Sequence, residues 1–158
     1  MQSSKVTKAV VEKFRDSLLR LHEKIIAVSG GDQGVRDIGG FEHAIYEIIS
    51  CAERYGSKKP FLIAAKAYSL LATRHYFVDG NKRTSHIVAK LVLLEYGYVF
   101  RPAYSEAVEF ILEIAGGNKS VEAIEDWIKD SASKVSTVNG YVRNLASDIE
   151  EMRNYADS

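Results

Sequence analysis

The sequence RHYFVDGNKRT at residues 74–84 separates two apolar helical patterns and decides how the chain folds. Before this stretch, apolar residues recur at helical spacing over residues 61–72. A second helical pattern covers residues 87–96, and Gly97 follows it where helices commonly end. Because Gly80 lies between the patterns and tolerates conformations that other residues avoid, the stretch predicts a helix end, a tight turn and a helix start.

The start of the second helix carries groups that suit phosphate binding. Asn81 is expected to cap this helix, because an asparagine side chain accepts a hydrogen bond from an otherwise unpaired amide. The first amides carry a partial positive charge toward the turn, and Lys82 and Arg83 add two full charges. Two cations are unfavourable at a helix N-terminus unless an anion compensates them. The pattern therefore indicates a phosphate site at residues 80–83.

Length, charge and cysteine content restrict the class of protein. The 158 residues suit one domain. Lys and Arg number 21, as do Asp and Glu, so neither nucleic acid nor a membrane surface is expected as a partner. Cys51 is the single cysteine, which excludes an internal disulfide and fits a reducing compartment. The reducing compartment that we expect is the cytoplasm, and no apolar run approaches the roughly 18 residues that span a bilayer.

The remaining sequence is dominated by helical patterns. Amphipathic stripes predict one helix over residues 4–28 and another from Phe41 to about residue 54. The glycine-bounded segment 35–40 between them predicts a short extended flap or hairpin. We therefore expect an all-α, orthogonally packed bundle with a buried central helix.

The C-terminal half adds three shorter elements. A brief extended segment is expected at residues 98–101. Ser105 and Ser120 each precede an amphipathic pattern, so both are expected to cap a helix.

From residue 132 onward the pattern changes. Six apolar residues repeat at spacings of 3, 4, 3, 4 and 3, the heptad pattern of a packed helix: Val135, Val138, Val142, Leu145, Ile149 and Met152. This divides the chain into a domain at residues 1–131 and a C-terminal helical extension at residues 132–158. The extension could pack on the domain or against a partner, such as a second copy in a homodimer through residues 135–155, and its sequence also leaves an inhibitory role open.

Residues 75–84, HYFVDGNKRT, resemble the His-x-Phe-x-Asp/Glu-Gly-Asn-x-Arg motif of the Fic superfamily. The lysine after Asn81 resembles the death-on-curing (Doc) branch of that family, the toxin of a toxin–antitoxin pair. The similarity covers about residues 15–131 and includes the glycines at 30 and 31. It implies a Fic/Doc-type orthogonal helical bundle with a short flap or hairpin, followed here by an extra C-terminal helix.

The resemblance implies a transfer from a nucleotide, with ATP and Mg²⁺ as cofactors, to a hydroxyl group of a target protein. His75 would be the general base that takes the proton of an attacking Ser, Thr or Tyr hydroxyl. Asp79 would hold Mg²⁺ together with phosphate oxygens and waters. The phosphate charge would be stabilised by Gly80, Asn81, Lys82 and Arg83.

The flap would align a segment of the target by strand addition, through main-chain hydrogen bonds. It comprises Val35, Arg36, Asp37 and Ile38. A plain surface loop is the alternative that the sequence leaves open.

Two positions depart from adenylylating Fic enzymes, in which a second Gly usually follows the Asn and a second Arg closes the motif. Lys82 and His86 occupy these positions here. Because a lysine should shift the nucleotide, Lys82 favours phosphoryl transfer, and the resemblance to Doc then implies a toxin that phosphorylates a translation-factor hydroxyl, with a small antitoxin as a possible partner. A Fic-like AMP transferase and a catalytically silent interaction module are the alternatives. His22 and His43 are interpreted as structural, whereas His86 could face the site.

Overall fold

The computed structural model describes residues 6–135, and its elements confirm the expected all-α architecture. In chain order they are α1 (Lys8–Ser29), α2 (Ile38–Tyr55), the 3-10 turn η1 (Gly56–Lys58), α3 (Pro60–Thr73), α4 (Asn81–Glu95), β1 (Tyr98–Phe100), α5 (Tyr104–Ala115), α6 (Val121–Ser131) and β2 (Ala132–Lys134). Pro60 is the first residue of α3, where its missing N–H would have had no partner in the helix.

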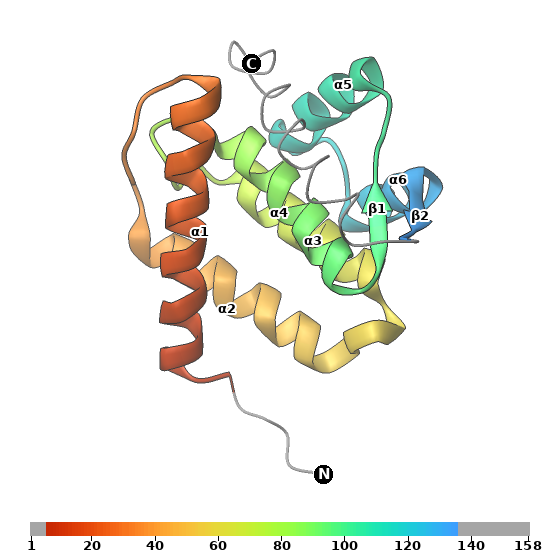
Figure 1. The fold of residues 1–158 in the computed structure, drawn as a ribbon, viewed down its shortest axis with the longest axis horizontal. Helices are drawn as coiled ribbons and strands as arrows, with labels where there is room; N and C mark the ends of the chain where they lie inside the picture. Colours follow the sequence, from red (N-terminus) through yellow and green to blue (C-terminus); the bar gives the residue numbers. More distant parts are fainter. Residues whose placement is uncertain (1–5, 136–158) are drawn as a thin grey trace.

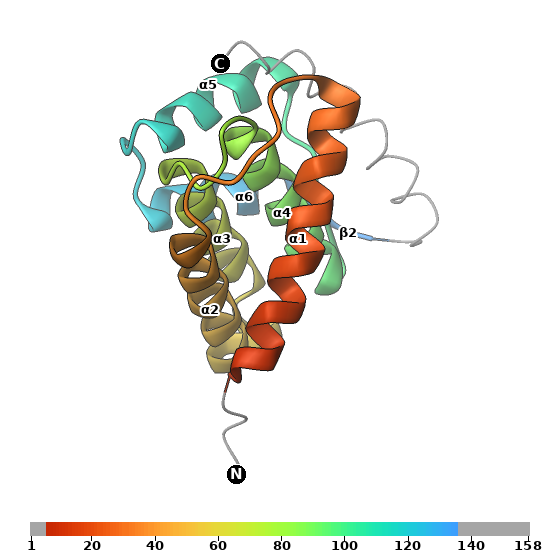
Figure 2. The ribbon, with the colours of Figure 1, turned by 90° about the vertical axis from the view of Figure 1, so that its left-hand side faces the viewer.

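Helices α3 and α4 lie side by side in the middle of the molecule, and the other helices cover them (Figures 1 and 2). α1 and α2 lie on one side of this pair, and α5 and α6 on the other (Figure 1). Every residue from 83 to 90 is buried, so α4 is the expected central helix. The turn that joins α3 to α4 therefore has a rigid support behind it.

Among the described residues, two large groups of side chains and a smaller one around Ile25 and Ile87 form the core. Tyr68 and Ala89 from the central pair pack with Phe100 and Trp127 on the α5 and α6 side. Phe41, Leu71 and Phe77 belong to the group on the α1 and α2 side. Full burial of a large apolar side chain contributes about 1.5–3 kcal/mol, so these groups fix the helices around the turn. Cys51 is also buried, with 6% of its surface exposed.

The start of α2 differs from the prediction. Residues 38–40 were expected to be extended, but α2 begins at Ile38. The reason is Asp37, whose carboxylate accepts a hydrogen bond of 2.8 Å from the N–H of Gly40 and caps the helix. A side chain at position 40 would collide with this carboxylate and with Tyr76, so the glycine serves packing here and does not end the helix.

The C-terminal elements correct two further predictions. β1 falls in the predicted extended segment, but it pairs antiparallel with β2, in a region that was expected to be helical. α5 begins at Tyr104 after Ala103, so Ser105 lies inside the helix and does not cap it. Ser120 caps α6 as expected, because its hydroxyl accepts the N–H of Ala123 at 3.1 Å.

The predicted heptad helix and its homodimer seam at residues 135–155 lie outside the described residues, apart from Val135. Among the helices of residues 6–135, none has both the length and the apolar content that crossing a bilayer requires.

Candidate active site

A hollow of about 160 Å³ opens where α3 ends and α4 begins. It is lined by Ala72, His75, Val78, Asp79, Gly80, Asn81, Lys82, Arg83 and Ala115. The six predicted site residues between 75 and 83 thus line one cavity. Ala115, the last residue of α5, also contributes to its wall. Pockets for drug-sized ligands measure about 300–1,000 Å³, so this hollow suits one part of a nucleotide, such as its phosphates.

Gly80 makes the turn that the sequence predicts. Its φ of +80° lies in the left-handed region, and it occupies the N-cap position of α4. The expected cap by Asn81 is wrong, because Asn81 is the first helical residue. Its Oδ1 accepts the N–H of Phe77 and its Nδ2 donates to the C=O of Phe77, each at 3.0 Å. Asn81 therefore fixes the loop that precedes the turn.

The first amides of α4 point toward the hollow with a partial positive charge. The N–H groups of residues 81–83 have no partner within the helix, because the first such bond runs from Thr84 to the C=O of Gly80 at 2.9 Å. The N–H of Gly80 does not join them, since it donates to Oδ1 of Asp79 at 2.6 Å. Considering residues 6–135, three main-chain donors thus remain for an anion.

Within residues 6–135, the hydrogen bonds of the Asp79 carboxylate all run to one of its oxygens, Oδ1. Oδ1 accepts both the Gly80 amide and Nη2 of Arg83, the latter at 2.9 Å. Within residues 6–135 no hydrogen bond occupies Oδ2, and 37% of the side chain is exposed. This fits a hard oxygen ligand for Mg²⁺. No cluster of three or more such ligands exists in the described part of the chain, so phosphates and waters would have to complete the coordination.

Arg83 is almost completely buried, with 2% of its surface exposed, and forms the floor of the hollow. Its Nη1 donates to the Ser29 hydroxyl at 2.7 Å and to the Gly30 carbonyl at 2.5 Å, while Nη2 holds Asp79. The guanidinium therefore joins the end of α1 to the turn. It places a permanent positive charge beneath the cavity.

Lys82 supplies the second charge and is half-buried at the cavity wall. Burial lowers the pKa of its ammonium group from the ordinary value, the Asp79 carboxylate acts against that shift, and the Arg83 charge adds to it. Since a bound anion would raise the pKa again, the position favours a phosphate.

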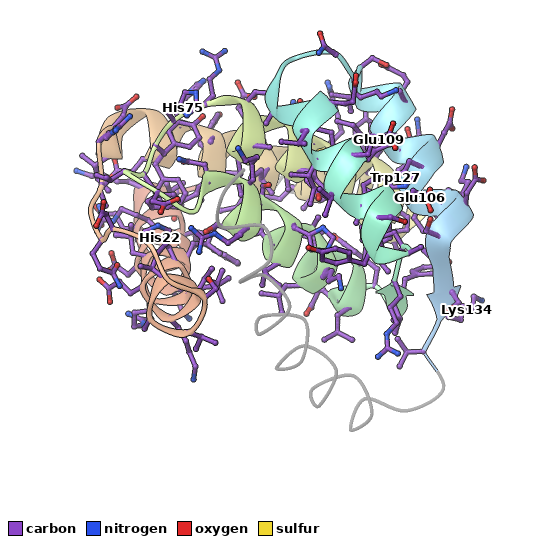
Figure 3. All side chains as sticks on the ribbon, turned by 90° about the horizontal axis from the view of Figure 1, so that it is seen from above. His22, His75, Glu106, Glu109, Trp127 and Lys134 are labelled. Carbon is purple, nitrogen blue, oxygen red and sulfur yellow. The ribbon has the colours of Figure 1, made fainter. Side chains whose placement is uncertain are left out.

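His75 stands exposed at the rim of the hollow, on the segment between α3 and the turn. In the part of the chain that the structure describes, no hydrogen bond engages its ring, so a ring nitrogen is available to a substrate hydroxyl. Figure 3 shows His75 and His22 in the same part of the molecule, away from Trp127 and Glu106.

The flap is partly confirmed as an extended segment. Val35 pairs with Phe77 as an isolated antiparallel bridge. The flanking bonds run from the Val78 N–H to the Gly34 C=O at 3.0 Å and from the Arg36 N–H to the Tyr76 C=O at 2.7 Å. Because antiparallel backbone groups alternate in direction, the N–H and C=O of Val35 point to the opposite edge.

Comparison with known proteins identifies the family. A sequence model of the Fic/DOC family matches residues 14–93, which include the flap and the whole turn. The chain belongs to the Fic/Doc family. It is also similar to a Fido domain-containing protein of Dictyostelium discoideum, with 27% identity over 92 residues. That alignment covers 58% of this chain and spans 64% of the length of the relative. Fic/Doc proteins generally transfer nucleotide-derived groups to proteins.

One position of the Fic/Doc motif lies outside the site. His86 was expected to be able to face the hollow, but it is buried one turn further along α4 and does not line the cavity. Its Nδ1 is 2.7 Å from the Tyr68 hydroxyl, and the Phe100 ring centroid is 5.8 Å away. Burial lowers the pKa of His86 well below its ordinary range, and the Lys90 charge acts in the same direction. His86 therefore belongs to the core.

Two residues at the Fic/Doc turn were not recognised as functional from the sequence. Gly31 lies so close to Asp79 that a Cβ atom there would be 2.2 Å from Oδ2. His22 on α1 contacts the Asp79 main chain. Both contacts join segments more than 45 residues apart, so the sequence offered no signal for them beyond the resemblance of His22 and Gly30–Gly31 to Doc-like proteins.

Proposed function

We propose that this Fic/Doc protein belongs to the Doc-like branch and transfers the γ-phosphoryl group of ATP to a Ser, Thr or Tyr hydroxyl of a target protein. The position of Lys82 carries the proposal. Its long cationic side chain lines the hollow at the N-terminus of α4, at the position where adenylylating relatives usually have glycine. A lysine there would restrict how closely the α- and β-phosphates approach the helix. The γ-phosphate, rather than the α-phosphate, would then occupy the site of attack.

His75 would act as the general base. Its free ring nitrogen accepts the proton of the target hydroxyl, and the hydroxyl oxygen attacks the γ-phosphorus. The bond from that phosphorus to the bridging oxygen breaks, and ADP leaves. Positioned bases of this kind contribute about 10²–10⁴-fold to a rate.

The residues beneath the phosphates would supply the electrostatic stabilisation on which phosphoryl transfer depends. The amides of residues 81–83, the Lys82 ammonium and the buried Arg83 guanidinium all direct positive charge into the hollow. Mg²⁺ bound to Oδ2 of Asp79 would neutralise phosphate charge further.

The flap would hold the acceptor segment. Its inner edge is bonded to the motif loop, and the outward N–H and C=O of Val35 can pair with an extended peptide. A target strand on this edge would lie one strand away from the loop that carries His75.

Labelled ATP tests the proposal. The purified protein is incubated with Mg²⁺ and cell extract, with ATP labelled at either the α- or the γ-phosphate. We expect protein labelling from γ-labelled ATP alone, and its loss on chelation of Mg²⁺ or in the folded variant His75→Ala. Labelling from the α-phosphate would instead assign AMP transfer, and labelling from neither would support a silent interaction module.

Lys82→Gly tests the geometry of the donor, with Lys82→Arg as the matched control that keeps a cation. The glycine variant should lose phosphoryl transfer and gain labelling from the α-phosphate, whereas the arginine variant should retain the γ-specific product. Mass spectrometry of the labelled protein distinguishes the two modifications. Equal product ratios in both variants would remove Lys82 as the determinant.

The Doc-like branch also implies a translation factor as target and a small antitoxin as partner. Expression of the wild-type chain should then slow protein synthesis in cells, measured by incorporation of a labelled amino acid. The His75→Ala variant, at the same expression level, should have no such effect.

A further inference from the structure

His22 lies on α1, behind the turn and away from the hollow. Its exposed fraction is 2%, and it is absent from the cavity wall. Its position in the fold nevertheless brings it to the main chain of the residue that would bind Mg²⁺. Nε2 is 2.8 Å from the carbonyl oxygen of Asp79, which lies 57 residues further along the chain.

The direction of this hydrogen bond follows from its partners. A carbonyl oxygen only accepts, so Nε2 carries a hydrogen and donates it. The ring is held in place by Phe77, whose ring is parallel to it within 9° at a centroid distance of 3.8 Å. The donor therefore points at Asp79 from a fixed platform.

The peptide between Asp79 and Gly80 is fixed at both of its polar groups. His22 holds the C=O, and the Asp79 carboxylate holds the N–H of Gly80. Ile26 closes the space behind it, since a Cβ atom at Gly80 would be 2.7 Å from Cδ1 of Ile26. Rotation of this peptide would also turn the Asp79 carboxylate, because Oδ1 of Asp79 accepts a hydrogen bond from the N–H of the same peptide.

We propose that His22 is a positioning residue for the transfer reaction: through the Asp79 carbonyl it sets the orientation of the Asp79–Gly80 peptide, and so the direction of the Asp79 carboxylate in the wall of the hollow. This rests on the proposed function, in which Oδ2 serves Mg²⁺. Arg83 restrains the carboxylate from the other side. The two contacts together restrain the orientation of Asp79, which is the preorganisation that transfer requires.

Two substitutions separate the hydrogen bond from simple packing. His22→Phe keeps an aromatic ring against Phe77 but removes the donor. His22→Gln loses the stacking but places an amide N–H near the position of Nε2. A purely structural histidine would tolerate phenylalanine better than glutamine, whereas a positioning residue shows the opposite order in catalysis.

The experiment measures melting temperature, kcat and KM for transfer, and hydrogen exchange of the Gly80 amide by NMR. We expect His22→Phe to fold, to lose about tenfold or more in kcat with little change in KM for the target, and to exchange the Gly80 amide faster. His22→Gln should stay within about threefold of the wild-type kcat.

Three results would overturn the assignment. They are a wild-type kcat in folded His22→Phe, equal impairment of the two variants, and an unchanged Gly80 exchange rate in His22→Phe. The exchange measurement needs no substrate, so it tests the restraint on the turn even if the proposed transfer fails. An inactive wild-type protein would refute the proposed function, and with it the catalytic part of this inference.

Discussion

Gly31 offers a sharp test of how the site is assembled. Its φ is +114°, and a Cβ atom there would lie 2.2 Å from Oδ2 of Asp79 and 3.0 Å from Nη2 of Arg83. Gly30, its neighbour, has a φ of +90° and nothing within 4 Å of the corresponding position. Gly31→Ala therefore combines backbone strain with a collision, whereas Gly30→Ala has the strain alone.

The strain should be similar in the two variants. An alanine held at such a φ costs about 1–3 kcal/mol. For a chain of this size, each kcal/mol lowers the melting temperature by about 2–4 °C. Both variants should therefore melt several degrees below the wild-type protein and remain folded at 25 °C.

The collision should appear in activity. Ordinary contact begins at 3.4 Å, so the Asp79 carboxylate would have to move by roughly 1 Å. The Arg83 hydrogen bond resists that movement. A misplacement of about 1 Å at a reacting centre costs about 10²-fold in rate, equivalent to about 2.7 kcal/mol in the barrier.

Initial rates with γ-labelled ATP and saturating Mg²⁺ measure the effect, alongside thermal melts of both variants. Gly30→Ala should keep most of its activity, and Gly31→Ala should retain about 1%. The reasoning is refuted if the two variants have rates within about threefold of each other at matched stability.

Two further predictions concern the framework of the site. Asn81→Ala leaves the N–H and C=O of Phe77 without their partner, so the free energy of unfolding should fall by about 1–3 kcal/mol; an unchanged urea midpoint would contradict this. Burial lowers the pKa of His86 in the folded chain, so only the unfolded chain binds a proton there as the pH falls below about 6.5. Stability should therefore be complete above that pH and fall on acidification by up to about 1.4 kcal/mol per pH unit. In urea unfolding between about pH 6.5 and 5, the free energy of unfolding of His86→Gln should fall less steeply with pH than that of the wild-type protein. Identical slopes in the two proteins would show that another group dominates the pH dependence.

The sequence was sufficient to predict an element wherever the signal for it is a local pattern. Helical spacing located the central pair, and Gly80 located the turn, because one residue without a side chain determines that conformation. Most residues that line the hollow lie between positions 72 and 83, so one local motif contained them, whereas Ala115 joins them from α5.

Contacts between distant segments escaped prediction. The start of α2 escaped prediction for a different, local reason: residues 38–40 contain two glycines and were expected to be extended, but the Asp37 carboxylate caps a helix there. β2 forms because β1 offers a partner across more than 30 residues. The contacts of His22, Ser29 and Gly31 with the turn likewise depend on how α1 packs, which no local pattern specifies.

The burial of Cys51 makes the molecule convenient to label. It is the chain's single thiol, and burial raises its pKa, which keeps it protonated and slow to react with maleimides. A cysteine introduced at Val35, 44% exposed at the flap, would then be the one thiol that a dye modifies readily. A fluorophore at that position would report the arrival of an acceptor peptide by a change in emission, without removal of the native cysteine and before any phosphate is transferred.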